Sequence, residues 1–159
     1  MKEVLLPVRF TSIEAVHAVL GTTIGPSATM LITQPLIDDF ARITGDHEWI
    51  HVDQVRAAHG PFGGTIAHGY FTLALVAGFA ARLFRLDFGD ATVNYGVDRV
   101  RFPAPLRVGA AVRATATFTE IAEHPLGNRI RVEYRLTSGD FEAIVCVAEA
   151  LLLIKRDLL

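Results

Sequence analysis

Residues that could do chemistry concentrate in the stretch "TGDHEWIHVD", residues 44–53, which holds two histidines, two aspartates and one glutamate. A carboxylate and an imidazole can move protons to and from a substrate, whereas clustered histidines and carboxylates can bind a metal ion. Asp46 and His51, five positions apart, form a candidate acid/base pair, and the stretch could also be an ordinary polar surface loop. These three interpretations make different demands on the backbone.

The letters "HEWIH" at residues 47–51 match the zinc-protease pattern H-E-x-x-H, in which both histidines share one face of a helix. A catalytic zinc also needs a third protein ligand. The extended motif requires a glycine and a histidine where this chain has Gln54 and Ala57, and no glutamate follows nearby. His59 and His68 could be recruited only by unusual geometry. We therefore interpret the match as chance and predict no metal site.

The spacing of Asp46 and His51 excludes a regular element as their common support. Five positions apart, they would lie about 140° apart around a helix and on opposite faces of a strand. Only a loop with irregular backbone can aim both at one atom, and Gly45 before them and "PFGG" at 61–64 after them indicate such a loop. On spacing alone, a turn or N-cap role for Asp46 is favoured over catalysis.

Length and composition favour one globular domain over residues 1–159. The chain is 51% hydrophobic and 20% charged, which is typical of a compact fold with a core. A net charge of −2 gives no attraction to nucleic acid or to an anionic membrane. The single cysteine, Cys146, excludes an intrachain disulfide and fits a reducing compartment. Because Glu3 and Pro7 interrupt the first residues, they do not resemble a signal peptide, and we expect a cytoplasmic protein.

Residues 57–81 contain no Lys, Arg, Asp or Glu, but they do not read as a membrane span. Their first half is filled by histidines, a proline and glycines, and only 70–81 is nearly continuously apolar. That stretch falls short of the roughly 20 residues that a span needs. It is apolar all round, so we predict a helix to about Phe84 that other structure surrounds.

Shorter elements precede this helix. Ser12 is placed to cap a helix that Gly21 ends, and residues 28–33 form a plausible strand. A second helix is predicted between Thr33 as its N-cap and Gly45 as its end.

After Asp90 the pattern changes to strands, at 91–102, 110–121, 129–137 and 141–154. The clearest, "RIRVEYRLT", alternates Ile130, Val132, Tyr134 and Leu136 with charged residues, and "TSGDFE" after it predicts a tight turn. The last strand is apolar on both faces, which suits a sheet centre or a subunit interface. One long helix followed by an antiparallel meander of about four strands predicts an α+β fold with the sheet curled around the helix.

The segments "FARITGDHEWIHVDQVRAA" and "PFGGTIAHGYFTLAL" resemble the MaoC-like family, the (R)-specific enoyl-CoA hydratases and dehydratases. "NYGVDRVRFPAPLRVGAAVRA" is similar to the family's strand and proline turn, and both ends of the chain resemble its NodN-like branch. Two positions depart from the pattern. His47-Glu48-Trp49 stands where many members have Asn-Pro, and Ala110 stands where an acidic residue is common; the first leaves the substrate range open. The family motif residues in this chain are Phe40, Ile43, Thr44, Gly45, Asp46, Ile50, His51 and Ala57.

The resemblance implies a hot-dog fold, an antiparallel sheet wrapped around one long central helix, in a homodimer paired through its sheets. It implies hydration of a trans-2-enoyl-CoA to an (R)-3-hydroxyacyl-CoA, or the reverse dehydration. Asp46 and His51 would be the catalytic pair and hold one water between them; which is the base and which the acid stays open. The acyl thioester of coenzyme A or of a carrier protein would be the substrate, with no cofactor.

By the same resemblance, Gly69 would donate its N–H to the thioester oxygen at the start of the long helix, where N–H groups are unpaired. Gly64 and Ile66 lie in the segment that leads there. Phe62 and Trp49 would be pocket walls, with core packing as the alternative. Asn94 would be a substrate donor or a support for a loop, and His68 a packing residue at the helix start. Arg99 and Arg101 could meet the phosphates of a carrier thioester, but a solvated strand face is favoured for them.

Two other functions remain as alternatives. A hot-dog acyl-CoA thioesterase often carries a carboxylate on or beside the long helix, and 70–81 contains none. A non-catalytic acyl-thioester-binding module would be favoured if Asp46 or His51 were missing, and both are present.

Overall fold

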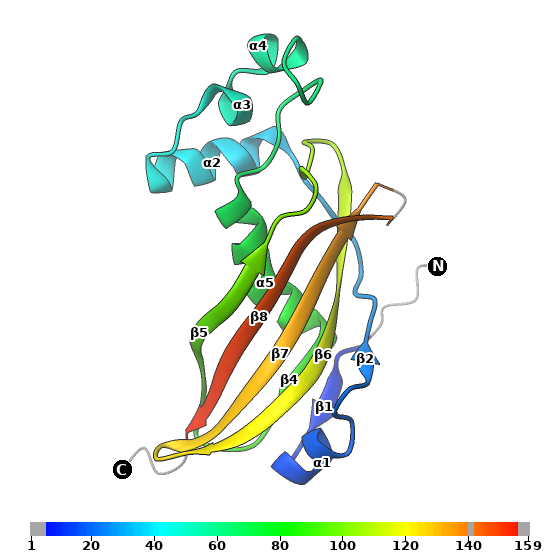
Figure 1. Ribbon diagram of the computed structural model, residues 1–159, viewed down its shortest axis with the longest axis vertical. Coiled ribbons are helices and arrows are strands. Elements are labelled where there is room, and N and C mark those ends of the chain that lie inside the picture. The colour runs from blue at the N-terminus through cyan, green and yellow to red at the C-terminus, as the bar shows by residue number, and fades with distance from the viewer. Residues whose placement is uncertain (1–5, 140–141, 156–159) are drawn as a thin grey trace.

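An antiparallel sheet with one long helix against it forms the body of the molecule in the computed structural model, which describes residues 6–139 and 142–155 (Figure 1). The helix is α5, Gly69–Leu83. The long strands are β5 (Ala91–Arg101), β6 (Ala111–His124), β7 (Gly127–Ser138) and β8 (Ala143–Lys155). The short strands β2 (Thr23–Ile24) and β3 (Met30–Leu31) both pair with β6. This is the hot-dog arrangement that the sequence predicts.

The strand order differs from the predicted four-strand meander. The sheet runs β2-β6-β7-β8-β5, so β5 pairs with the last strand and not with β6, its successor in the chain. Ala91 lies opposite Lys155 and Arg101 lies opposite Val147. After α5 and β4 (Phe84–Leu86), residues 87–90 run along the bottom of the sheet to its edge beside β8, where β5 begins, and residues 102–110 then lead from the top of β5 to the start of β6 (Figure 1).

The core lies between α5 and the inner face of the sheet. The predicted alternation of β7 is confirmed, since Ile130, Val132, Tyr134 and Leu136 are all buried. The helix contributes Phe71, Val76, Phe79 and Leu83 to the same layer. β8 lies between β7 and β5, and its second half is buried on both faces, as its apolar pattern predicts.

The outer face of α5 corrects one prediction. We expected a helix buried all round, but in the single chain only one stripe faces the sheet, and Tyr70 is 75% exposed. The other exposed positions of α5 are Ala74, Ala77, Gly78, Ala81 and Arg82, and all of them except the arginine are small. The apolar pattern misleads here because alanine and glycine expose little apolar area, so a row of them does not require a covering layer.

The N-terminal elements lie beside the sheet. β1 (Val8–Phe10) pairs in parallel with β4 (Phe84–Leu86), directly after α5. Ser12 caps α1 (Ile13–His17) as predicted, by accepting a hydrogen bond from the Ala15 N–H at 3.2 Å. The helix ends at His17, before the predicted Gly21, and the predicted 28–33 strand is confined to Met30–Leu31.

α2 (Gln34–Thr44) has the predicted bounds, with Thr33 as N-cap and Gly45 in the left-handed conformation at φ 78°. Two short helices follow, α3 (Trp49–Val52) and α4 (Gln54–Ala58), and they lie with α2 above one end of the sheet (Figure 1). The dipeptide 140–141 of the predicted "TSGDFE" turn lies outside the described residues.

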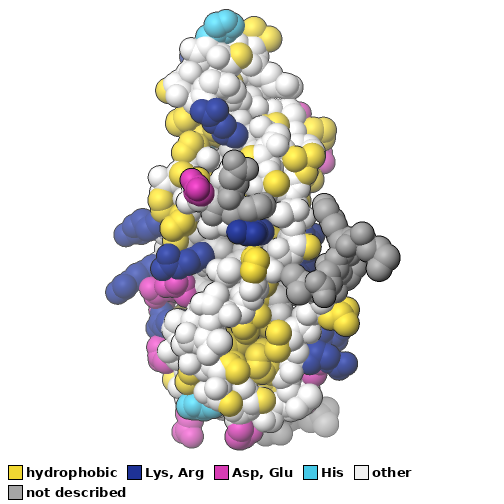
Figure 2. All heavy atoms as spheres, turned by 90° about the vertical axis from the view of Figure 1, so that its right-hand side faces the viewer, with side chains coloured by type: hydrophobic (Ala, Val, Ile, Leu, Met, Phe, Trp, Pro, Cys, Tyr) yellow, Lys and Arg dark blue, Asp and Glu magenta, His cyan; other side chains and the backbone are white. Residues whose placement is uncertain are grey.

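On the face seen in Figure 2, basic and acidic side chains lie beside one another and apolar atoms are visible between them. Arg131 is the centre of one ion-pair network, with Asp98, Glu120 and Glu149. Arg99 and Arg101 are exposed, as predicted for a solvated strand face. Among the helices of the described residues, none combines the length and the apolar character needed to cross a bilayer.

Candidate active site

Asp46 and His51 converge on one point although they come from different elements. α2 stops at Gly45, whose N–H donates to the Ala41 carbonyl at 2.8 Å, and Asp46 follows in irregular backbone. His51 lies on α3 and is only 8% exposed. A carboxylate oxygen of Asp46, a ring nitrogen of His51 and a ring nitrogen of His68 all lie within 4.8 Å of one another.

Asp46 also has the turn role that spacing alone favours. Its Oδ1 accepts a hydrogen bond from the Glu48 N–H at 3.3 Å, across the turn that leads into α3. The side chain is exposed, so the carboxylate can face solvent and the cluster together. The local role and the approach to His51 are compatible, because a carboxylate has lone pairs for several partners.

His51 is held in one tautomer. Its Nδ1 lies 2.7 Å from the Ile66 carbonyl oxygen. Because a carbonyl only accepts, Nδ1 carries the hydrogen and Nε2 keeps its lone pair. Burial lowers the pKa of His51 below its ordinary value of 6.5, and the neighbouring His68 lowers it further; the bond to Ile66 and the charges of Asp46 and Glu48 oppose this. The uncharged imidazole is therefore favoured at neutral pH, with a basic nitrogen available.

A partly buried polar chain supports the backbone of His51. The Gln34 side-chain amide, at the start of α2, donates to the His51 carbonyl at 2.8 Å. The hydroxyl of Thr65, itself buried, donates to the Gln34 Oε1 at 2.6 Å. Three segments distant in sequence are thereby joined behind the imidazole.

The third member of the cluster, His68, was predicted to be a packing residue at the helix start. It is the N-cap residue of α5 and is 2% exposed. Its ring stacks on that of His51, with centroids 3.8 Å apart and planes tilted by 28°. Its Nε2 lies 3.0 Å from the Asp46 main-chain carbonyl. It therefore touches both members of the predicted pair.

The three side chains do not form a good zinc site despite their proximity. A metal ion lies close to the plane of each imidazole that binds it, ~2.0 Å from the nitrogen, but these two rings are stacked face to face, with centroids 3.8 Å apart and planes tilted by only 28°. His47 of the H-E-x-x-H pattern lies before α3 begins and is exposed. It therefore shares no helical face with His51.

A cavity of about 330 Å³ opens beside His51. Of the predicted substrate-binding residues, Phe62, Ile66 and Gly69 line it. Gly69 is the first residue of α5, and a β-carbon added there would lie 2.8 Å from the Phe102 ring, so main chain forms this part of the wall. Sequence reasoning assigned no site role to the remaining lining residues, namely Ala67, Thr72, Phe102, Pro103, Ala104, Pro105, Leu106 and Val145. The proline turn after β5 was the available signal for several of them.

The other predicted residues lie elsewhere. Trp49 packs against Gly60 and under the Arg56 guanidinium, 4.2 Å from the ring centroid. Gly64 has φ 152°, which favours glycine, on the approach to α5. Asn94 lines separate cavities between α5 and the strands β5 and β8, the smaller about 150 Å³. None of these three is among the described residues that line the cavity beside His51.

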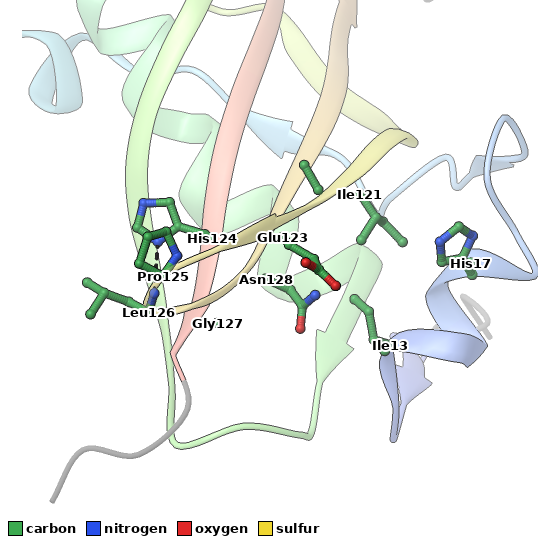
Figure 3. A pocket seen from close by; sticks show the side chains of 10 residues that line it. Ile13, His17, Ile121, Glu123, His124, Pro125, Leu126, Gly127 and Asn128 are labelled. Carbon is green, nitrogen blue, oxygen red and sulfur yellow. Dashed lines mark hydrogen bonds between the residues drawn. The ribbon is translucent and has the colours of Figure 1, made fainter.

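A larger cavity, about 530 Å³, lies at the other end of the sheet between α1 and the β6–β7 hairpin (Figure 3). His17, Glu123 and His124 are among its lining residues, and Figure 3 shows His17 and His124 at opposite ends of the group, with Glu123 between them. His124 instead accepts a hydrogen bond from the Leu126 N–H within the hairpin. The titratable groups of this cavity therefore do not converge as Asp46 and His51 do.

Comparison with known proteins places the chain in a family. Residues 15–140 match the family described as "MaoC like domain". The 3-hydroxyacyl-thioester dehydratase Z of Mycobacterium tuberculosis is 41% identical over 145 residues, covering 89% of this chain and 95% of that protein. Nodulation protein N of Rhizobium meliloti is 45% identical over 106 residues, 64% of each chain. The unliganded R-hydratase from Pseudomonas aeruginosa superposes with a TM-score of 0.70 at 26% identity, covering 87% of this chain and 83% of that one.

Proposed function

The chain belongs to the MaoC-like family, and we propose that it is a hydro-lyase that adds water to a trans-2-enoyl thioester to give the (R)-3-hydroxyacyl thioester, or catalyses the reverse dehydration. Coenzyme A is the proposed carrier. The observation that carries this proposal is the approach of Asp46 and His51 to within 4.8 Å of each other, near the first N–H of α5. Two atoms that share one water by hydrogen bonds of ordinary length lie up to about 5 Å apart.

In the proposed reaction His51 is the base. Its Nε2 lone pair accepts one proton from the water while the Asp46 carboxylate accepts a hydrogen bond from the other hydrogen. The water oxygen then bonds to C3, and the electron pair of the double bond moves toward the thioester oxygen. His51 next returns its proton to C2, which restores the neutral imidazole. Water and thioester supply every atom of the product, so the proposal needs no cofactor.

The fixed tautomer of His51 supports this assignment. Because Nδ1–H donates to the Ile66 carbonyl, only Nε2 is free to accept a proton from water. Positioned proton transfer of this kind is commonly worth roughly 10²–10⁴-fold in rate.

We assign Gly69 N–H as the donor to the thioester oxygen, where negative charge develops. It is the first N–H of a 15-residue helix, so it has no partner within the helix and lies at the positive end of the dipole. One such donor is worth about 3 kcal/mol. Phe62 and Ile66 would contact the thioester within the cavity. Gly64 would shape the approach, while Trp49 would act through packing.

A spectrophotometric assay tests the proposal. Purified protein is mixed with crotonyl-CoA and with longer trans-2-enoyl-CoAs, and the absorbance of the conjugated enoyl thioester is followed. Wild type should remove it, and Asp46→Asn and His51→Ala should each lower kcat by roughly 10²–10⁴-fold. His47→Ala is the matched control, since His47 is an exposed histidine of the same stretch. Release of free thiol would instead identify a thioesterase, and no turnover at any chain length would favour a binding module.

We also propose that the functional form is a homodimer joined along β5. This strand is the edge of the sheet, and nearly all of its residues are exposed in the single chain. Three of its apolar side chains, Val93, Tyr95 and Val97, are 40–52% exposed. An edge strand with exposed apolar side chains is normally covered or paired with another strand. Light scattering coupled to gel filtration should give twice the monomer mass, and Val97→Lys should lower it to the monomer value.

A further inference from the structure

We propose that His68 is a positioning residue of the hydration reaction: it holds the Asp46 main chain and supports the His51 ring, so that both groups reach the same water. This inference rests on the proposed function and assigns a part of the same site. His68 itself need not contact the substrate.

The first contact is the hydrogen bond to Asp46. A carbonyl only accepts, so the His68 Nε2 carries the hydrogen and donates it to the Asp46 carbonyl oxygen at 3.0 Å. This bond restrains the backbone that carries the carboxylate. Its neighbour Gly45 has no atom within 4 Å of a β-carbon built on it, so tight packing does not hold this turn in place.

The second contact is the stack on His51. With ring centroids 3.8 Å apart, His68 covers one face of the imidazole, while the Ile66 carbonyl holds its edge. A ring fixed by one hydrogen bond can still tilt about that bond. A ring that is also covered on one face is confined much more closely.

The third contact connects His68 to the helix. The His68 carbonyl accepts from the Thr72 N–H at 3.0 Å and from the Thr72 hydroxyl at 3.1 Å, in the first turn of α5. Gly69, the proposed oxyanion donor, is the next residue. One side chain and its own peptide therefore link the carboxylate, the imidazole and the helix start.

The remaining ring nitrogen of His68 distinguishes this role from ordinary packing. Nδ1 is buried and has no hydrogen-bond partner among the described residues. A residue selected only to fill this space would not need a nitrogen there, because an unpaired buried polar atom costs about 1–3 kcal/mol. The imidazole combines an Nε2–H donor and a flat face of the right size to stack on His51, and the unpaired Nδ1 comes with it.

Two variants separate the contacts. His68→Phe keeps a ring that can stack and loses the donor to Asp46, whereas His68→Gln keeps a donor at about the same reach and loses the ring. Each should lower kcat by roughly 10- to 100-fold while KM for crotonyl-CoA changes much less, since misplacement by about 1 Å can cost 10²-fold. His59→Gln is the control. The ring of that exposed histidine lies 3.0 Å from the Val55 carbonyl at the end of α4, away from the Asp46–His51 pair in the chain, and its loss should leave kcat unchanged.

The pH profile gives a readout that mere packing would not move. The acidic limb of kcat/KM reports the protonation of His51, and the titratable groups that influence it are His68, Asp46 and Glu48. Because His68 helps to lower the pKa of His51, both variants should shift this limb toward higher pH. A double variant adds a second test: in an Asp46→Asn background, His68→Phe should cost little further kcat, because its partner is already disabled.

An NMR titration of the His51 imidazole in wild type and both variants makes the test independent of turnover. His51 should titrate at higher pH in His68→Phe and His68→Gln than in wild type. If both variants fold, keep wild-type kcat and leave the titration unchanged, His68 is only a packing residue and the inference is wrong. If wild type hydrates no enoyl thioester but the titration shifts as expected, the proposed function fails while the positioning of His51 by His68 stands.

Discussion

Two glycines of α5 provide a matched pair of substitutions at the start and in the middle of the same helix. A β-carbon added at Gly69 would lie 2.8 and 2.9 Å from two ring carbons of Phe102, in the wall of the cavity beside His51. A β-carbon added at Gly78 meets nothing within 4 Å. Neither glycine has a positive φ, so alanine is compatible with the backbone at both positions.

The two substitutions should change the free energy of unfolding in opposite directions. Gly78→Ala should raise the free energy of unfolding by about 0.5–1 kcal/mol, the ordinary gain from replacing an exposed helical glycine. Gly69→Ala gains less, because Gly69 is only the first residue of the helix. Its overlap with Phe102 costs about 1–3 kcal/mol if the ring stays in place. The net loss is therefore about 0.5–2 kcal/mol, and each kcal/mol lowers Tm by roughly 2–4 °C in a chain of this size.

The same overlap should damage turnover. Phe102 is 41% exposed, so its ring can swing outward, but it then leaves the wall of the proposed substrate cavity. Either response disturbs the space beside the Gly69 N–H, and we expect kcat/KM for crotonyl-CoA to fall by roughly 10- to 100-fold. Gly78→Ala should leave it unchanged.

Thermal melts and enoyl-CoA kinetics on the two single variants check this prediction. A Gly69→Ala/Phe102→Leu double variant should recover part of the lost stability relative to the sum of the single changes, because a smaller side chain relieves the overlap. The reasoning is refuted if Gly69→Ala and Gly78→Ala have the same Tm and the same kcat/KM.

Three further outcomes follow from buried groups. Burial lowers the pKa of His51 below 6.5, so between its folded pKa and pH 6.5 the unfolded chain binds a proton at His51 more readily than the folded chain does. Stability is therefore undiminished by this group above pH 6.5 and decreases as the pH falls toward the folded pKa. The decline in Tm between pH 7.5 and 5.5 should be smaller in His51→Gln, and an equal decline would contradict this. Thr65→Val removes the donor to Gln34 Oε1 and should lower the free energy of unfolding in urea by about 1–3 kcal/mol; an unchanged midpoint would show that the bond is dispensable. Burial raises the pKa of Cys146 to about 11, so a disulfide reagent at pH 8 should modify the thiol in urea and not in the folded protein.

The local elements of the fold were predictable where the sequence marks both ends or one face. Thr33 and Gly45 bound α2 as predicted, and the alternation in β7 gives its buried face directly. The position of β5 was not predictable in this way. Its pairing with β8 depends on the path that the chain takes after α5 and β4. The alternation of apolar and polar residues within β5 does not encode that path. The outer face of α5 was mispredicted because hydropathy does not separate a small residue that faces solvent from one that faces a partner.

The chemistry of the site was more predictable than its support. The spacing of Asp46 and His51 rejects a helix or a strand, and the structure does place them on irregular backbone and a four-residue helix. Phe62, Ile66 and Gly69 line the cavity, whereas Trp49, Gly64 and Asn94 remain predictions without a place in its wall. His68 was underestimated because its partners lie 17 and 22 positions away and meet it only after α5 has docked.

Main-chain hydrogen bonds explain how such a site can tolerate unusual neighbours. The Ile66 N–H donates to the Ile50 carbonyl at 3.1 Å, the Ala67 N–H to the Leu106 carbonyl at 2.7 Å, and the Val108 N–H to the Thr65 carbonyl at 3.0 Å. These bonds connect the His51 helix, the approach to α5 and the proline turn without using side chains. The departure from the family pattern at residues 47–49 falls outside them, and His47 and Glu48 are exposed. Variation in these exposed side chains is therefore compatible with fixed relative positions of the carboxylate, the imidazole and the helix start.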